Sequence, residues 1–254
     1  FGRLKRSLWR SASRVVAISR FTADRVIEQG VHPSRVALLP PGLDPGEVPP
    51  ARSGDAAAAR RARGLGPGPI LLTVSRLAAS ERYKGHELVF DAVARLGPRF
   101  PGLVHVVVGE GDDRPRLEAE ALRRGVAGRV RFAGRQSDAD LADWYRLADV
   151  FVMPSGVLRD REGLKFEGFG IVYLEAAAAG LPVVAARAGG AVDAVVDGAT
   201  GLLVDPGDPD GLAAALESIL SDPPLARTFG RAGRERALRD FLWHRLPVRE
   251  RLGP

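Results

Sequence analysis

The sequence predicts an α/β protein built on a doubly wound parallel sheet. Short runs rich in Val, Ile and Leu alternate with stretches of helix length, and turn signals such as Gly109-Glu110-Gly111 and Pro206-Gly207 separate them. Several of these runs are apolar at every position, which is typical of strands that helices cover on both faces. Repeated strand–helix units of this kind indicate a parallel sheet between two helix layers.

The predicted elements follow one another regularly along the chain. The strands are expected at 15–19, 36–40, 70–75, 104–109, 130–133, 150–154, 183–186 and 201–204. The helices are expected at 21–29, 84–96, 114–124, 138–148, 171–179, 191–196 and 208–220. A further basic, Trp-containing helix is expected over 240–253, with an interruption at Pro247.

A proline-rich stretch over 40–50 marks a boundary, and an Ala- and Arg-rich stretch over 55–63 follows it. The residues before this boundary hold too few elements for a core of their own. We therefore expect four parts. They are the tail of a truncated preceding domain at 1–46, a linker at 47–63, a complete α/β domain at 64–235 and a C-terminal helix at 236–254.

The composition narrows the classes of function. The chain has 37 basic and 31 acidic residues, a net charge of +6 that suits anionic ligands, acidic membrane surfaces or nucleic acid. Most basic residues are Arg, in a chain also rich in Ala, Gly and Pro, which favours a coding bias as the cause. The absence of Cys excludes disulfides and thiolate sites, and no apolar run approaches the ~20 residues of a membrane span. Nucleic-acid binding would rest on net charge alone, without interleaved aromatic residues, so it is not expected.

The segment from 154 to 184 is the most informative for function. A strand ends, a polar loop follows, and Glu167-Gly168-Phe169-Gly170-Ile171 opens a helix that contains Glu175. The glycines leave backbone N–H groups accessible at a positively polarised helix end, which makes an anion site. Two carboxylates suit the hydroxyls of a sugar or ribose, so the combination suits a nucleotide sugar. Alternatively, both glutamates are solvated and the glycines serve capping and packing; the residues alone leave both interpretations open.

Glu167 and Glu175, with seven residues between them, resemble the E-x7-E signature of family-4 retaining glycosyltransferases of the GT-B fold, the glycosyl transferases group 1. Further motifs resemble this family in its order, and the resemblance covers about residues 14–245. They lie at 16–19, 36–44, 74–77, 84–87, 107–111, 130–134, 145–150 and 197–204. The long Arg-rich loop before Glu167 is most similar to the phosphatidylinositol-mannosyltransferase-like branch.

The resemblance implies a role for each matched residue. Arg76 and Lys84 would hold the donor diphosphate and offset the charge that grows on the leaving phosphate. Glu167 would contact the donor sugar, and Glu175 would accept hydrogen bonds from the ribose. Backbone amides would face the sugar and the phosphate at Gly168, Phe169, Gly170 and Ile171. The base would be read by backbone groups near 134–136, with Arg135 as a further candidate.

The chain departs from the family pattern between the two cations. Arg76 and Lys84 are eight positions apart, whereas the commonest spacing in the family is five. We expect the extra residues, within 78–83, to bulge as a loop. Arg82 competes for the phosphate role, but Gly85 directly after Lys84 favours Lys84. Taken alone, Arg76 is also compatible with an ordinary surface position after a strand.

Neither a metal nor a cofactor is expected. Asp138-Ala139-Asp140 and Asp208-Pro209-Asp210 match the DxD metal motif of another glycosyltransferase fold, but both lie where helices should start, so Asp should cap them. Gly109-Glu110-Gly111 begins like a dinucleotide fingerprint, yet Arg114 stands where its third glycine belongs.

The resemblance implies a hexosyltransferase that uses a GDP- or UDP-sugar, with mannose as one option for the hexose. The acceptor would be a lipid, a glycan or a small molecule, and the anomeric configuration would be retained. Residues 64–235 would form the Rossmann-like, nucleotide-sugar-binding C-terminal half. Residues 1–46 would be the tail of a truncated N-terminal acceptor domain, toward which 236–254 would return. Because most of that domain is missing, we expect the fragment alone to be inactive.

Two alternatives remain at this stage. One is a nucleotide-sugar epimerase or hydrolase of the same fold, and the other is a non-catalytic nucleotide-sugar-binding module. The cytoplasm is the expected location, with the inner face of the membrane as an option. Residues 1–14 are basic with apolar Phe1, Leu4 and Leu8, which fits membrane-surface contact, although a helix on the domain surface is favoured.

Overall fold

The computed structural model describes residues 9, 11–46, 48–49, 56–161 and 163–247. Its centre is a six-stranded sheet in the order β10-β9-β6-β3-β4-β5, and every neighbouring pair is parallel. The strands are β3 (Ile70–Val74), β4 (Val104–Val108), β5 (Val130–Gly134), β6 (Val150–Met153), β9 (Val183–Ala186) and β10 (Gly201–Val204). The chain builds outward from β3 to β5 and then crosses to the other side of β3. This reversal confirms the doubly wound α/β fold.

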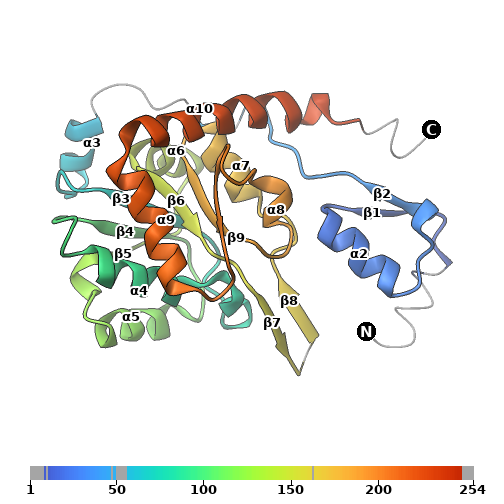
Figure 1. Cartoon of the computed structure of the whole chain (residues 1–254), viewed down its shortest axis with the longest axis horizontal. Coiled ribbons are helices and arrows are strands. Elements are labelled where there is room, and N and C mark those ends of the chain that lie inside the picture. Colours follow the sequence, from blue (N-terminus) through green and yellow to red (C-terminus); the bar gives the residue numbers. More distant parts are fainter. Residues whose placement is uncertain (1–8, 10, 47, 50–55, 162, 248–254) are drawn as a thin grey trace.

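Helices cover both faces of this sheet (Figure 1). One layer contains α4 (His86–Leu96), α5 (Arg114–Arg123) and α9 (Pro209–Ser221). The other contains α6 (Asp138–Leu147), α7 (Ile171–Ala178) and α8 (Ala191–Ala194). Successive strand residues alternate between the two cores, so Leu71 packs on the first layer and Leu72 on the second. The strands are apolar throughout because both of their faces are buried.

The N-terminal described segment forms a small separate sheet. β1 (Val15–Ala17) and β2 (Val36–Leu38) pair in parallel, and α2 (Arg20–Glu28) and a short 3-10 turn (Pro33–Arg35) connect them. Ser19 caps α2 through a reciprocal capping box with Thr22. The unit packs on the main domain through a 2.5 Å ion pair between Arg20 and Asp193 and through Phe21, whose ring lies 4.7 Å from that of Phe166. The predicted helix character of 1–8 lies outside the described residues.

The polar loop expected before Glu167 is a β-hairpin instead. β7 (Val157–Asp160) and β8 (Gly163–Phe166) pair in antiparallel fashion, and the hairpin projects downward from the main body in Figure 1. Each strand has only four residues, and β7 is exposed along its whole length. Such short strands lack the alternation of apolar and polar residues that identifies a half-buried strand in a sequence.

The last helix that the structure describes lies at a position that the sequence analysis did not predict. α10 (Pro223–Asp240) packs on α7 and α9, and a 3-10 turn (Trp243–Arg245) follows it, so the helix expected over 240–253 is wrong in its described part; 248–254 lie outside the described residues. Pro223 and Pro224 stand in the first turn, where no intrahelical N–H bond is lost. Gly230 is needed because a Cβ there would lie 2.1 Å from the Gly180 carbonyl oxygen.

Two further segments complete the chain. The connecting helix expected in the linker region is α3 (Ala56–Ala62), and short 3-10 turns lie at Ala79–Lys84 and Ala127–Arg129. Near the end of the chain, backbone bonds join Leu43 to the residues that follow α10: the Leu43 amide donates to the Phe241 carbonyl at 2.6 Å, and the Trp243 amide donates to the Leu43 carbonyl at 3.0 Å. Among the described helices, none is both long and apolar enough to cross a bilayer.

Candidate functional site

A cleft of about 600 Å³ opens at the carboxyl edge of the sheet. Its walls come from the residues that follow β3, β4 and β5 and from the first turn of α7. Three charged side chains that the sequence singled out, Arg76, Lys84 and Glu167, line it together. The cleft lies next to β3, where the strand order reverses, which is the usual ligand position in doubly wound sheets.

The two cations reach the cleft from one short segment. Arg76 follows β3 and has a side chain that is 78% exposed, whereas the Lys84 side chain is only 11% exposed. Gly85 makes the position of Lys84 feasible. Its φ is +76°, and a Cβ there would approach the Pro154 carbonyl oxygen to 2.7 Å. Arg82, the competing cation, pairs with Asp113 at 3.1 Å and does not line the cleft.

Sequence analysis missed the carboxylate that joins these cations. Glu81 forms an ion pair with Arg76, and its Oε2 lies 3.2 Å from Nζ of Lys84. Glu81 lies in the extra residues between the two cations, which fold into the 3-10 turn Ala79–Lys84 rather than an open loop. The only sequence signal was its position three residues before Lys84. The ligand-free cleft thus holds its two cations around a protein carboxylate.

Glu167 lies opposite Lys84, with 4.0 Å between Oε2 and Nζ. Burial raises the pKa of the Glu167 carboxyl above its usual value, and the charge of Glu81 adds to this. The Lys84 ammonium opposes the rise, as do hydrogen bonds from the backbone amides of Gly168 and Phe169. The carboxylate is therefore held in a poorly solvated position beside a cation.

The four amides expected to face a ligand separate into two pairs. Gly170, the N-cap of α7 with φ +82°, and Ile171 line the cleft. Gly168 and Phe169 do not line it, and their amides bond to Glu167. The Phe169 side chain is 2% exposed and packs with its ring 5.8 Å from that of Phe241. Only the amides of Gly170 and Ile171 are placed to meet an anion directly.

Glu175 lies one turn further along α7 and does not line the cleft. Its Oε2 accepts a 2.6 Å hydrogen bond from the hydroxyl of Tyr145 on α6. Burial and the charge of Glu175 raise the pKa of Tyr145 well above its usual range, so the phenol stays a neutral donor. The sequence placed Tyr145 in a family motif but gave no sign that it touches Glu175.

The residues after β5 complete the cleft on its far side. Arg135 and Gln136 line it, and the Arg135 amide donates to Oε1 of Glu110 at 3.2 Å. The Gln136 side chain is fixed at both ends, because it donates to the Ala133 carbonyl at 2.7 Å and accepts from the Trp144 indole at 3.2 Å. The region expected to read a base is therefore part of the same cleft.

Two buried histidines lie within hydrogen-bond distance of hydroxyl side chains in β3 or directly after it. His86 Nε2 lies 3.1 Å from Ser75 Oγ, and His105 Nε2 lies 2.9 Å from Thr73 Oγ1. Burial lowers the pKa of His86 to about 4 and that of His105 to about 3, so both are neutral near pH 7.

Both DxD sequences lie at helix starts. Asp208 is the N-cap of α9 and accepts from the amides of Asp210 and Gly211. The N-cap of α6 is Ser137 rather than Asp138, which corrects that detail, and Asp138 and Asp140 lie in the first turn. Within the described residues, no group of three or more His, Asp and Glu side chains is suited to a metal.

Comparisons with known proteins give the family of the chain. The family model of glycosyl transferases group 1 matches residues 57–236. The chain is 38% identical over 240 residues to the GDP-mannose-dependent alpha-(1-6)-phosphatidylinositol monomannoside mannosyltransferase of Mycolicibacterium smegmatis, covering 94% of this chain and 61% of that relative.

Solved structures give the same result. Sucrose-phosphate synthase from Thermosynechococcus elongatus superposes with a TM-score of 0.79 at 32% identity, covering 95% of this chain and 57% of that one. HepE from Anabaena, solved with UDP-glucose, superposes with a TM-score of 0.81 at 26% identity, covering 94% of this chain and 63% of that one. These neighbours are GT-B glycosyltransferases. The chain belongs to the glycosyl transferases group 1 family.

Proposed function

We propose that this chain is the donor-binding part of a retaining hexosyltransferase that transfers a hexose from a nucleotide diphosphate sugar. The observation that carries the proposal is the grouping of Arg76, Lys84 and Glu167 around one cleft at the strand-order reversal. The chain spans 61% of the mannosyltransferase it resembles, so the activity of the whole protein is part of the proposal.

In this proposal the diphosphate lies between Arg76 and Lys84, where Glu81 now lies. Both cations can make charge-assisted hydrogen bonds to phosphate oxygens. As the glycosidic bond breaks, negative charge grows on the leaving phosphate, and fixed cations stabilise that charge more than they stabilise the bound donor. Two cations and the amides of Gly170 and Ile171 do this without a metal, so we propose that none is required.

The sugar lies next to Glu167. Its carboxylate accepts hydrogen bonds from sugar hydroxyls and stabilises the positive charge that develops at the anomeric centre. Because Glu167 is poorly solvated and held by two backbone amides, it does not need to reorganise when that charge appears. Catalytic roles are therefore proposed for Arg76, Lys84 and Glu167.

The ribose lies toward Glu175. A carboxylate offers about four acceptor sites, and the bond from Tyr145 takes one of them. Glu175 does not line the cleft, so reading the ribose requires that the nucleotide reach α7 past Ile171. The base then lies against 134–136.

The choice of donor and acceptor follows the relatives. The mycobacterial relative is named for GDP-mannose, whereas HepE was solved with UDP-glucose. We propose GDP-mannose as the donor and UDP-glucose as the alternative, with a lipid, glycan or small-molecule acceptor. We propose that the reaction takes place in the cytoplasm, at the inner face of the membrane when the acceptor is a lipid. The relatives named above are transferases or synthases, which favours transfer over epimerisation or hydrolysis.

Calorimetric titration tests the donor site. GDP, UDP, GDP-mannose and UDP-glucose are titrated into the folded chain in the presence of EDTA. We expect one nucleotide series to bind at sub-millimolar concentration and to bind more weakly at high salt. The Lys84→Ala variant should lose most of this affinity. If neither series binds at millimolar concentration, the donor-site assignment is wrong.

A transfer assay separates the classes of activity. Sugar-labelled GDP-mannose and UDP-glucose are incubated with membrane lipid extract and the protein, with and without the polypeptide encoded directly upstream. Label in the lipid or glycan fraction supports a transferase. Release of free labelled sugar alone supports a hydrolase, and donor binding without either product supports a binding module.

A further inference from the structure

The structure has a second cleft, at the opposite edge of the sheet from the donor cleft. Its volume is about 750 Å³, larger than the 600 Å³ of the donor cleft. Pro69 and Val150, at the amino ends of β3 and β6, form part of its wall, whereas Val74 and Val108 at the carboxyl ends line the donor cleft. Other parts of the wall come from α3, the end of α6, the turn after α7, the end of α9 and the first half of α10. No residue lines both clefts.

The charged residues that line this second cleft are almost all basic. Its lining contains a single acidic residue, Asp149, and several arginines. These are Arg60, Arg146, Arg227, Arg231 and Arg234. A guanidinium is planar and can give two parallel hydrogen bonds to a phosphate, so this composition favours an anionic ligand such as a phosphate over a neutral or cationic one.

Three of these arginines already have partners in the fold. Arg60 donates to the Leu147 carbonyl and pairs with Asp149 at 2.8 Å. Arg146 pairs with Asp143 at 2.9 Å, and Arg234 donates to the Ala178 carbonyl at the end of α7. These three fix the wall of the cleft.

Arg227 and Arg231 differ from the other three. In the part of the chain that the structure describes, neither has a hydrogen bond or an ion pair, and both are exposed. They lie four residues apart on α10 and therefore project from the same side of the helix. Like charges at this spacing destabilise a helix unless something neutralises them. An anion at the rim of the cleft would neutralise both.

Apolar side chains also line the second cleft. They are Val150, Ile219, Leu220 and Ala226. A site with two exposed guanidinium groups and apolar surface beside them suits a ligand with a phosphate at one end and an apolar or ring-shaped body at the other.

We propose that this cleft is a second binding site, for a phosphate ester or diphosphate, with Arg227 and Arg231 as the residues that hold its phosphate. The ligand is either a soluble phosphorylated compound or the headgroup of an anionic phospholipid. The proposal does not depend on the function proposed for the donor cleft, because the two share no residues.

Residue-resolved NMR tests this site with pyrophosphate as the probe. The ¹⁵N-labelled chain is titrated, and the amides of Ala226 and Gly230 report on the second cleft while those of Gly109 and Gly170 report on the donor cleft. We expect both sets to shift, with different affinities. The proposal is overturned if the amides of Ala226 and Gly230 do not shift at up to 20 mM pyrophosphate, roughly the weakest binding that counts as a site.

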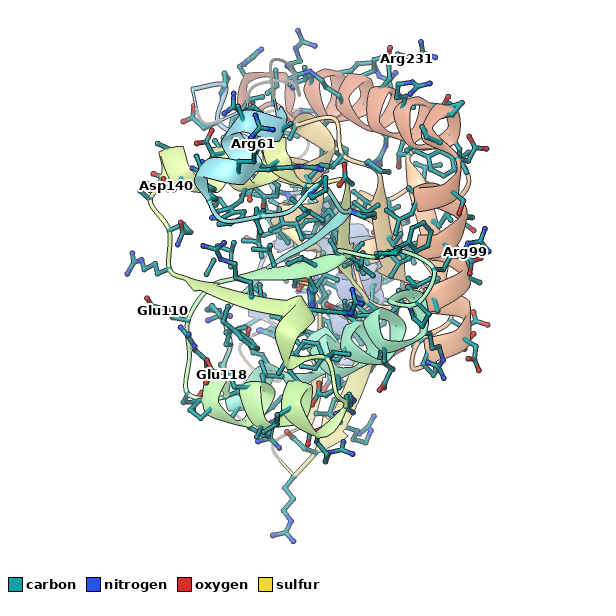
Figure 2. All side chains as sticks on the ribbon, turned by 90° about the vertical axis from the view of Figure 1, so that its left-hand side faces the viewer. Arg61, Arg99, Glu110, Glu118, Asp140 and Arg231 are labelled. Atoms are coloured by element: carbon teal, nitrogen blue, oxygen red, sulfur yellow. The ribbon has the colours of Figure 1, made fainter. Side chains whose placement is uncertain are left out.

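Three variants make the test specific. Arg231→Gln should weaken binding at the second cleft about fivefold, and the Arg227→Gln/Arg231→Gln double variant at least about tenfold, while the shifts at Gly109 and Gly170 stay unchanged. Arg61→Gln is the matched control. Arg61 on α3 faces the same side of the molecule as Arg231 but does not line the cleft, so its loss should change affinity less than about twofold (Figure 2). Equal effects of Arg61→Gln and Arg231→Gln would show unspecific attraction and overturn the proposal.

Vesicle sedimentation then separates the two sources of phosphate. The chain is mixed with vesicles of pure phosphatidylcholine or of phosphatidylcholine with 30% phosphatidylglycerol, a composition of about the anionic content of a bacterial inner leaflet. Binding to the second kind alone, lost in the double variant, assigns a lipid headgroup. Pyrophosphate binding without vesicle binding assigns a soluble phosphorylated ligand.

Discussion

The Tyr145 hydroxyl donates a 2.6 Å hydrogen bond to Oε2 of Glu175 and so joins α6 to α7 on one face of the sheet. Tyr145 is 1% exposed and packed against Phe151, which leaves its ring in one position. The orientation of Glu175 is therefore set by a residue 30 positions earlier in the chain. Tyr145 is a positioning residue for the carboxylate that we propose reads the ribose.

Replacement of Tyr145 by Phe should weaken recognition of the ribose. We expect the affinity for the bound nucleoside diphosphate to fall about fivefold to tenfold, less than the ~1.5–3 kcal/mol of a hydrogen bond to a charged group, because Tyr145 acts on the ligand only through Glu175. Affinity for the 2′-deoxy nucleotide should fall less, because it lacks one of the hydroxyls that Glu175 would hold. Tyr173→Phe is the control, since its hydroxyl donates a 2.8 Å bond to the Met153 carbonyl and not to Glu175. An unchanged ribose-to-deoxyribose ratio in Tyr145→Phe would contradict the proposed role.

Glu167 and Glu175 should act on different parts of the donor. Glu167→Gln should weaken binding of the nucleotide sugar more than binding of the nucleoside diphosphate, whereas Glu175→Gln should weaken both equally. In the active transferase, Glu175→Gln should mainly raise KM, and Glu167→Gln or Lys84→Ala should lower kcat at least ~10-fold, about 1.4 kcal/mol for one charged contact. Steady-state kinetics with a saturating acceptor measure this difference. A Glu167→Gln enzyme with normal kcat would leave Glu167 as a loop anchor only.

Loss of the Glu81 charge should strengthen diphosphate binding. Glu81 holds Arg76 and Lys84 in the ligand-free cleft, and its charge repels the diphosphate that we propose binds there. We expect Glu81→Gln to bind the nucleoside diphosphate about threefold to tenfold more tightly, with a lower melting temperature for the empty protein. Glu110→Gln is the matched control, because Glu110 lines the same cleft but contacts the Arg135 amide instead. Weaker binding by Glu81→Gln would mean that Glu81 prepares the cations for the ligand and does not compete with it.

The buried histidines should make the fold sensitive to acid. Burial lowers the pKa of His86 to about 4 in the folded protein, although Glu87 opposes this, and the usual value is 6.5. Between these values the unfolded chain binds a proton that the folded chain does not, so stability falls as the pH drops from about 6.5 to about 4. His105 extends the effect to about pH 3. Each histidine should contribute about 1.4 kcal/mol per pH unit within its window.

Urea unfolding at pH 7, 6 and 5 measures this slope. His86→Gln should reduce the slope of stability against pH by about half, because one of the two buried histidines is gone. His244→Gln serves as the control for the substitution itself, since His244 is exposed. The explanation fails if His86→Gln and the unmodified chain lose stability in parallel over this range.

The fold class could be predicted because the sequence of each strand by itself shows how the strand is buried. A strand such as Val150–Met153 is apolar at every position, and only burial on both faces explains this. Arg76, Lys84 and Glu167 could be named because the motifs around them resemble those of the family, and the fold brings them together at the carboxyl edge of the sheet. The cap at Asp208 could also be predicted, because a cap bonds to amides two or three residues away.

Only the tertiary structure decided the features that depend on contacts between residues distant in the sequence. The hairpin β7–β8 and the helix α10 have weak local sequence signals. Cross-strand pairing positions the hairpin, and the close approach of Gly230 to Gly180 positions the helix. Tyr145 meets Glu175 only because α6 and α7 pack on the same face of the sheet. The second cleft gathers arginines from α3, α6 and α10, which are far apart in the sequence. Hydrophobic patterning determines which faces are buried, but side-chain contacts form between whichever elements that burial brings together.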